Sequence, residues 1–379
     1  MINFSSVKIK YIGTVVTGKT PSTKKASNFG NEYMFVTPSD LLNGYIIKST
    51  ERYLSSSGLQ SISSNTIDGI SVLVGCIGSD MGNVAITTEK CATNQQINAI
   101  TNFKPGINPF YVYYWLLPKK KYLRQIAGCT TTPILPKTTF EEIEITIPET
   151  HHQNKIVDIL SSIDNKIELN NRIIAELEAM AKTIYDYWFV QFDFPNAEGK
   201  PYRSSGGEMV WNEQLKREIP KGWEAKSVIS TFDVCYGYPF DTNQFVDFPN
   251  EKPVVRIRDI LNCDVSAYTT ESVDVKYWLQ EKDLVIGMDG NFHMNFWSST
   301  PALLNQRCVR IRGNEEYSAL QAYFASLPYI KAREKNVTRT TVGHLSADDI
   351  NSLYILTPDL PLQKKITEMF DSFLEKMCK

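Results

Sequence analysis

The sequence is poor in the features that mark secreted, disulfide-bonded or membrane proteins. Its 379 residues include seven cysteines, an odd number with no Cys-x-x-Cys pair. This spacing argues against a disulfide framework and against the common zinc sites, and it predicts a reduced, cytoplasmic protein. Residues 1–11 lack the cationic start and apolar core of a signal peptide. No apolar run approaches the length that spans a bilayer, so we expect no membrane association.

Sequence signatures of catalysis are also missing. The glycine-rich stretch 75–82 lacks the Gly-Lys-Ser/Thr ending of a phosphate-binding loop. Asn108-Pro109-Phe110 resembles the Asn-Pro-Pro-Phe motif of amino-methyltransferases, but it lacks the second proline and no glycine-rich strand–turn–helix precedes it. We interpret it as a helix start. The histidines lack metal-ligand spacing, and no carboxylate cluster suits a nuclease. The chain is therefore predicted to be non-catalytic, with no metal or cofactor of its own.

An overall excess of positive charge is absent as well. The formal net charge is −2, which by itself is a weak argument against nucleic-acid binding. A DNA-binding protein can still be near neutral if its cations are clustered, so the local distribution of charge decides.

An internal repeat is the main feature that the sequence does contain. With an offset of 210 residues, an ungapped series of identities runs from Pro118/Pro328 to Ile156/Ile366. Further upstream the offset drifts by a few residues, as changes in loop length would cause. The matched pairs are Lys121/Lys331, Thr130/Thr340, Thr131/Thr341, Leu135/Leu345, Ile145/Ile355, Pro148/Pro358, Gln153/Gln363, Lys155/Lys365, Asn94/Asn305, Gln95/Gln306, Gly75/Gly287, Gly78/Gly290 and Gly18/Gly237. Chance similarity is the alternative, but the matches keep their order across most of each half.

Each copy follows the same plan. A strand-rich portion precedes an aromatic helical stretch (109–117 in the first copy), a basic Thr-rich loop, a short alternating strand and a helix. We predict an α+β protein with two similar strand-rich domains in tandem. The expected boundaries are 1–148 for the first domain, 149–190 for the first helix, 191–222 for a Gly- and Pro-rich linker, 223–358 for the second domain and 359–379 for a shorter second helix.

The first helix carries the clearest periodic signal. Apolar residues at alternating spacings of four and three form an a/d seam, with Asn170 as its polar member, and this pattern is typical of a helix that packs lengthwise on another helix. The seam comprises Ile156, Leu160, Ile163, Ile167, Asn170, Ile174, Leu177, Ala181, Ile184 and Trp188. The corresponding seam of the second helix comprises Ile366, Phe370, Phe373 and Met377. We expect the two helices to pair. The alternative is two separate amphipathic helices, each lying on its own core.

Positive charge gathers at the same place in both copies. The first copy has five basic and no acidic residues between 115 and 137, and both basic stretches lead into threonines. Lys and Arg suit phosphates, and Thr hydroxyls make short positioning contacts. The alternative is a solvated helix face. The predicted contacts are Lys119, Lys120, Lys121, Arg124, Thr130 and Thr131, and in the second copy Lys331, Arg333, Lys335, Arg339, Thr340 and Thr341.

A second group of side chains has the chemistry that reads base edges. Asn and Gln suit adenine, and Arg suits guanine. The candidates are Asn94, Gln95, Gln96, Asn305, Gln306 and Arg307. The alternative is that these residues end strands and cap turns. Weaker candidates are Lys19, Lys24, Lys25 and Tyr238, together with Arg256 and Arg258, which we expect on one face of a strand.

These residues resemble a known family, the specificity subunits of type I restriction–modification enzymes. The resemblance covers the whole chain and is most specific from Thr130 to Pro148, at Gln153, in the heptad helix, and over 188–195 and 204–223. It implies two target-recognition domains that each read one half of a split DNA site. It also implies two helices that pair antiparallel and set the gap between the halves.

The resemblance further implies that this chain binds double-stranded DNA together with partner subunits. Two methyltransferase subunits would use S-adenosylmethionine to methylate adenine, and motor-nuclease subunits would use ATP and Mg²⁺. One departure is the short second helix, which leaves the pairing incomplete or dependent on another chain. The alternatives are a fused restriction–modification enzyme or lone methyltransferase, and a helical scaffold whose two domains bind protein.

Overall fold

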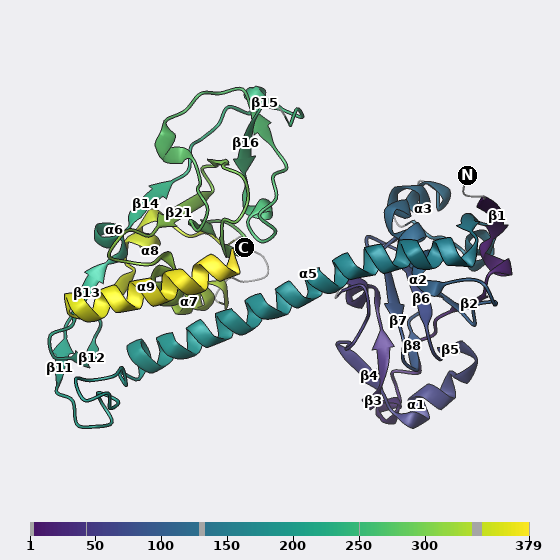
Figure 1. Cartoon of the computed structure of the whole chain (residues 1–379), viewed down its shortest axis with the longest axis horizontal. Coiled ribbons are helices and arrows are strands. Elements are labelled where there is room, and N and C mark those ends of the chain that lie inside the picture. The colour runs from purple at the N-terminus through teal and green to yellow at the C-terminus, as the bar shows by residue number, and fades with distance from the viewer. Residues whose placement is uncertain (1–3, 43, 129–132, 250, 336–342, 379) are drawn as a thin grey trace. The chain divides into compact units, whose positions relative to one another are not determined.

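The computed structural model describes residues 4–42, 44–128, 133–249, 251–335 and 343–378 (Figure 1). The chain divides into two compact units, Met1–Asn170 and Asn171–Lys379, here called unit 1 and unit 2. The division falls inside a helix rather than in the Gly- and Pro-rich segment, because each half of that helix packs on a different core.

Unit 1 is built on two four-stranded sheets and a two-stranded ladder. The first sheet has the order β2-β9-β6-β7 and is antiparallel throughout. The second has the order β4-β3-β8-β5 and contains one parallel pair, β3 with β8. The ladder pairs β1 with β10. The strands are β1 (Phe4–Lys8), β2 (Thr14–Thr17), β3 (Phe29–Val36), β4 (Arg52–Leu54), β5 (Thr66–Ile67), β6 (Ser71–Gly75), β7 (Val84–Thr87), β8 (Cys91–Thr93), β9 (Ile97–Thr101) and β10 (Glu144–Pro148).

Unit 2 repeats the order of the first sheet and differs at the edges of the second. Its sheets have the orders β14-β21-β18-β19 and β15-β17-β16-β20, with one parallel pair, β16 with β20, and its ladder pairs β13 with β22. The predicted repeat is confirmed by the shared order of the first sheet and by the parallel pair in the second, whereas β5 lies beside β8 in unit 1 and β15 lies beside β17 in unit 2. The strands are β13 (Glu224–Ser227), β14 (Asp233–Tyr236), β15 (Phe245–Val246), β16 (Lys252–Val255), β17 (Tyr268–Thr269), β18 (Leu284–Gly287), β19 (Met294–Phe296), β20 (Leu303–Leu304), β21 (Cys308–Arg312) and β22 (Tyr354–Thr357).

The helices also occur in matching places. The predicted aromatic helix is α2 (Pro109–Leu116), which begins where the Asn108 side chain accepts a hydrogen bond from the Phe110 backbone N–H. Its counterpart in unit 2 is α7. The helices are α1 (Ser56–Ser61), α2, α3 (Lys120–Ile126), α4 (Lys137–Glu141), α5 (Thr150–Tyr185), α6 (Val228–Thr231), α7 (Ala319–Lys335), α8 (Ala347–Asn351) and α9 (Leu360–Met377).

A buried glutamine fixes the start of the last helix in each unit. Gln153 in α5 donates from Nε2 to the Gly106 carbonyl at 3.0 Å, and Gln363 in α9 donates to the Glu316 carbonyl at 2.9 Å. Both side chains are 1% exposed. Buried amides are costly unless they are hydrogen-bonded, so this shared pair of bonds holds both helices in register with the same loop.

The long helix α5 is confirmed, and it ends in a π-helical turn at Asp186–Val190 (Figure 1). In unit 1 its early turns contact the core through Ile156 and Val157. In unit 2 its late turns contact the core through Ala181, Ile184 and Trp188.

The predicted pairing of α5 with α9 is only partly correct. The two helices approach antiparallel, because Ile174 and Met377 line one cavity while Tyr185 packs near Phe370, with ring centroids 6.5 Å apart. The seam before Asn170 is different. Ile163 and Ile167 are 50% and 53% exposed. The physical reason is length, since α9 has 18 residues and α5 has 36. The deepest α9 residues pack on the core of unit 2, where Phe370 contacts Phe324 of α7.

Segment 191–222 is not the irregular linker that its composition predicted. It contains the hairpin of β11 (Met209–Asn212) and β12 (Arg217–Pro220). Phe192 and Phe194 are buried, and both lie against Trp223, with Phe194 stacked at a centroid distance of 4.7 Å. Glycines and prolines make the turns here, while the aromatic side chains add to the core of unit 2.

The cysteines of the described chain are all free thiols, and most are buried. Burial raises the pKa of Cys76, Cys91 and Cys308 to about 12, which keeps these thiols protonated and unreactive. None of the helices in the described ranges is both long and apolar enough to cross a membrane.

The aromatic packing of segment 191–222 gives a stability prediction. Trp223→Ala should lower the stability of unit 2 by about 3–5 kcal/mol, because it removes a buried indole and leaves a cavity. The matched control is Trp211→Ala in the hairpin, where the indole is 57% exposed and the loss should stay below about 0.5 kcal/mol. Calorimetry of both variants measures the difference. Equal effects would mean that Trp223, with Phe192 and Phe194 packed against it, does not belong to the core.

Candidate nucleic-acid interface

Four turns of unit 1 are joined by backbone hydrogen bonds into one group, here called turn cluster 1. It comprises residues 18–20, 76–78, 94–96 and 133–135. The backbone N–H of Lys19 donates to the Thr93 carbonyl, that of Cys76 to Gln96, and that of Gly78 to Pro133. The Thr20 hydroxyl donates to Oε1 of Gln95 at 2.8 Å. The cluster therefore places Lys19, Gln95 and Gln96 together, although they lie far apart in the sequence.

Unit 2 has the same arrangement, turn cluster 2, from residues 237–239, 288–290, 305–307 and 343–345. The backbone N–H of Tyr238 donates to Leu304, that of Met288 to Arg307, and that of Gly290 to Gly343. The isolated bridge Ile77↔Ile134 of unit 1 has its equivalent in Asp289↔His344. The two clusters thus share a backbone and differ in their side chains.

A glycine is required at one point of each cluster. A Cβ atom on Gly18 would lie 2.1 Å from the Asn94 carbonyl oxygen, and one on Gly237 would lie 2.0 Å from that of Asn305. Both distances are far below van der Waals contact, so these paired glycines allow the turns to approach.

The predicted amide residues have different fates in the structure. Asn94 is buried, and its side chain accepts from the Gln96 backbone N–H and donates to the Gln96 side chain. Asn305 likewise accepts from the Arg307 backbone N–H. The turn-capping alternative is therefore correct for both asparagines, because Asx turns consume their oxygens. Gln95, Gln306 and Arg307 are exposed.

The basic residues of unit 1 lie on and just before α3. Lys120 donates to Oδ1 of Asn83 at 2.6 Å, and Arg124 donates to the Ser79 carbonyl. Both bonds tie α3 to the bend that follows turn cluster residues 76–78. The Lys119 ammonium lies over the Trp115 ring, 5.1 Å from its centroid, and Lys121 is exposed. Part of the predicted phosphate-binding charge therefore has a structural partner.

In unit 2 the basic residues at the end of α7 are more fully paired. Arg333 forms an ion pair with Asp349 at 3.1 Å, and Lys331 pairs with Glu334 at 2.8 Å, whereas Lys335 is exposed. Although burial raises the pKa of Asp349, hydrogen bonds from Tyr329 and Ser346 and the charge of Arg333 lower it to about 2. Thr130, Thr131, Arg339, Thr340 and Thr341 lie outside the described residues.

The expectation that Arg256 and Arg258 share a strand face is wrong. Strand β16 ends at Val255, and Arg256 instead begins a short 3-10 turn in which Asp259 accepts from its backbone N–H. The Arg256 guanidinium donates to the Ser266 carbonyl and hydroxyl. Burial and the charge of Arg258 lower its pKa.

The remaining weaker candidates stand in different surroundings. Lys24 and Lys25 are exposed in the loop that precedes β3. Tyr238, a member of turn cluster 2, is half-buried and packs edge-on against Phe240 and Tyr277.

Two residues of turn cluster 2 are not among those predicted from the sequence. Oδ1 of Asp289 lies 2.5 Å from Nδ1 of His344, and its Oδ2 lies 3.2 Å from a guanidinium nitrogen of Arg307. The repeat could have revealed both residues, because the matching positions in the first copy are Ile77 and Ile134. A change from two isoleucines to an aspartate and a histidine at matched positions was the available signal.

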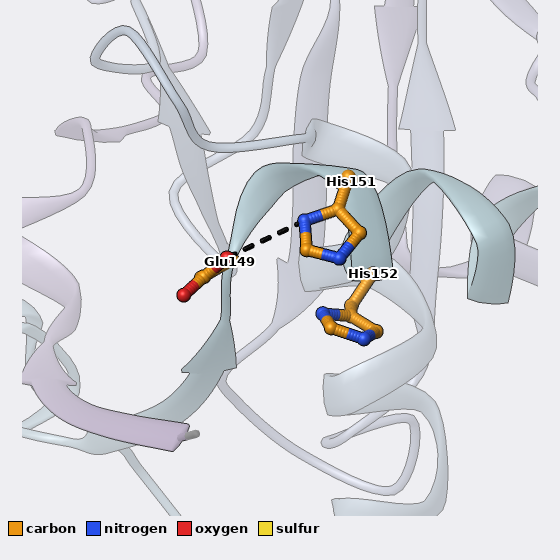
Figure 2. Close-up of side chains that lie close together, drawn as sticks. All are labelled: Glu149, His151 and His152. Atoms are coloured by element: carbon orange, nitrogen blue, oxygen red, sulfur yellow. Dashed lines mark ion pairs between the residues drawn. The ribbon is translucent and has the colours of Figure 1, made fainter. Parts of the chain in front are cut away.

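A further group comes together at the first turn of α5. Figure 2 shows the Glu149 carboxylate facing Nδ1 of His151 at 3.4 Å, with the His152 ring beside it. The two imidazole centroids are 3.8 Å apart, and Nδ1 of His152 is buried without a hydrogen-bond partner. These three side chains offer ligand atoms, but the positive end of the helix dipole opposes a cation there. The second copy has Asp359, Pro361 and Leu362 at these positions, so the group is not part of the repeated plan.

Comparison with known proteins agrees with the duplicated architecture. The family model described as the type I restriction modification DNA specificity domain matches residues 1–179 and again 220–378. The MjaIX specificity subunit of Methanocaldococcus jannaschii is 29% identical over 391 aligned residues, covering 98% of this chain and 86% of the relative. The EcoBI specificity subunit of Escherichia coli is 33% identical over 160 residues, covering 42% of this chain and 34% of the relative.

Solved structures agree on the fold. The crystal structure of a type I restriction–modification S subunit from M. genitalium superposes with a TM-score of 0.56 at 15% identity, covering 99% of this chain and 91% of that one. Two copies of the family domain, a first sheet with the same strand order in both units and a shared helix all point the same way, and the chain belongs to the family of type I restriction–modification DNA specificity subunits.

Proposed function

We propose that this chain reads a bipartite site on double-stranded DNA, with unit 1 reading one half and unit 2 the other. The observation that carries this proposal is the duplicated turn cluster. Each cluster presents exposed polar side chains on the same backbone frame, Gln95 and Lys19 in one unit and Gln306 and Arg307 in the other. Amide and guanidinium groups can distinguish base edges in the major groove, so two different sets of side chains fit two different half-sites.

The chain would act without catalysing a reaction itself. Two methyltransferase subunits would dock on it and methylate adenine with S-adenosylmethionine, and motor-nuclease subunits would cut DNA with ATP and Mg²⁺. Support comes from the membership of the chain in the specificity family. The partner subunits therefore bind the cofactors, and this chain recognises the DNA target.

The middle of α5 offers a surface for the methyltransferase subunits. Large apolar side chains along it are between 42% and 64% exposed, an uncommon exposure for isoleucine and methionine. They are Ile159, Ile163, Ile167, Ile173 and Met180. Apolar residues repeated at helical spacing on an exposed helix favour packing against helices of a partner.

Domain exchange tests the proposal. Replacing residues 1–148 with the equivalent region of a relative should change one half of the methylated motif and leave the other half intact, because each unit reads its own half-site. Methylome sequencing of a host that carries the chain with its methyltransferase gives the motif. As a control, the purified chain alone with S-adenosylmethionine should transfer no methyl group to DNA. A change in both halves of the motif would refute two independent readers.

The exposed cations give a second prediction. Lys121→Ala and Lys335→Ala should each weaken the binding of the assembled complex to DNA of any sequence by the same factor. Each lost phosphate contact should reduce the slope of log Kobs against log salt by about 0.9. Lys216→Ala is the control, because its ammonium pairs with Glu213 in the β11–β12 turn. Titrations on duplex DNA at several salt concentrations measure the slope. An altered motif with an unchanged slope would mean that these lysines contact bases.

A further inference from the structure

Three polar side chains converge at turn cluster 2 from separate parts of unit 2. Asp289 follows β18, Arg307 precedes β21, and His344 lies before α8. The Asp289 carboxylate bridges the other two, with one oxygen 3.2 Å from Nη1 of Arg307 and the other 2.5 Å from Nδ1 of His344. The Arg307 and His344 side chains are each 56% exposed, so both remain accessible to a ligand.

Unit 1 has the same backbone at this place without the charges. Its equivalents of Asp289, Arg307 and His344 are Ile77, Gln96 and Ile134. The backbone bond from Cys76 to Gln96 is 2.7 Å long, and the matching bond from Met288 to Arg307 is 2.9 Å. The fold therefore forms this turn with no ion pair. Because exposed ion pairs contribute little to stability, the presence of Asp289, Arg307 and His344 in unit 2 needs an explanation other than folding.

The chemistry of the trio suits a base edge better than a phosphate. An Arg guanidinium donates two parallel hydrogen bonds to O6 and N7 of guanine. A carboxylate beside the arginine would repel a phosphate, which is also an anion. The same carboxylate fixes one edge of the guanidinium, so fewer side-chain rotamers are lost when the remaining donors bind a base.

We propose that Arg307 reads a guanine in the half-site bound by unit 2, and that Asp289 positions Arg307 for this contact. His344 holds the second oxygen of Asp289 and so fixes the carboxylate. In unit 1 the matching residue is Gln96, whose amide does not suit guanine. The inference rests on the proposed function and adds to it a base and a residue that recognises it.

The test uses the assembled complex with its cognate methyltransferase. The half-site read by unit 2 is the half that stays unchanged when residues 1–148 are exchanged. Arg307→Ala should reduce the preference for guanine at one position of that half by roughly 10- to 100-fold, with the other positions unaffected. Arg203→Ala, which removes an exposed arginine from segment 191–222, is the matched control and should leave the motif unchanged. Equal weakening on every sequence would show a phosphate contact and overturn the inference.

Asp289→Asn separates positioning from folding. It keeps the size of the side chain but removes the charge, so it should relax the motif at the same base pair as Arg307→Ala, with the melting temperature unchanged. The double variant should show no further loss, because Asp289 acts through Arg307. Relaxation at a different position, or additive losses, would refute the positioning role.

The outcomes for the two proposals can be told apart. If the wild-type complex methylates no split motif, the proposed function fails. If it methylates a split motif that lacks guanine in the unit 2 half, or one that Arg307→Ala leaves intact, only the present inference fails.

Discussion

The structure depends on the packing of one continuous helix against two separate cores. In unit 1, Asp164 of α5 accepts a hydrogen bond from Tyr114 of α2 at 2.6 Å. In unit 2, Glu178 accepts one from Tyr323 of α7 at 3.0 Å. Burial and the neighbouring carboxylate raise the pKa of both tyrosines, so the phenols stay protonated and keep donating. The same helix therefore contributes a partly buried tyrosine–carboxylate contact to each unit.

Duplication followed by divergence explains how one frame can serve two targets. The paired glycines Gly18 and Gly237 and the buried glutamines Gln153 and Gln363 keep the backbone alike in both units. The exposed positions around that frame are free to differ, since a surface substitution changes stability little. A specificity protein needs this separation, because a new target must be acquired without disturbing the fold or the helix that carries it.

Much of the architecture could be predicted from the sequence, because it depends on the spacing of apolar residues and on the order of the repeated residues. Repeat spacing gave the two domains, and the heptad seam gave α5. Hydrogen-bond partners could not be predicted in this way. The sequence places Asn94 among the base contacts and does not show that its side chain caps its own turn, nor does it show that Arg333, a predicted phosphate contact, pairs with Asp349. Segment 191–222 was misjudged because Gly and Pro density marks turns but does not show whether intervening aromatic residues, such as Phe194, are buried. Asp289 and His344 are 55 residues apart in the sequence, so their contact could be recognised only from the folded structure.

We propose that the length of α5 sets the distance between the two half-sites, and inserting one heptad tests this proposal most directly. The place for it is within 169–173, where every side chain is exposed and no core contact would be broken. Seven residues add roughly 10 Å and leave the helix face almost unrotated. With about 3.4 Å per base pair, the unread gap should lengthen by up to ~3 base pairs, with both half-sites unchanged. A two-residue insertion, which turns the following residues by about 200°, should abolish assembly with the methyltransferase. An active heptad variant that methylates the original motif with its original gap would contradict the account.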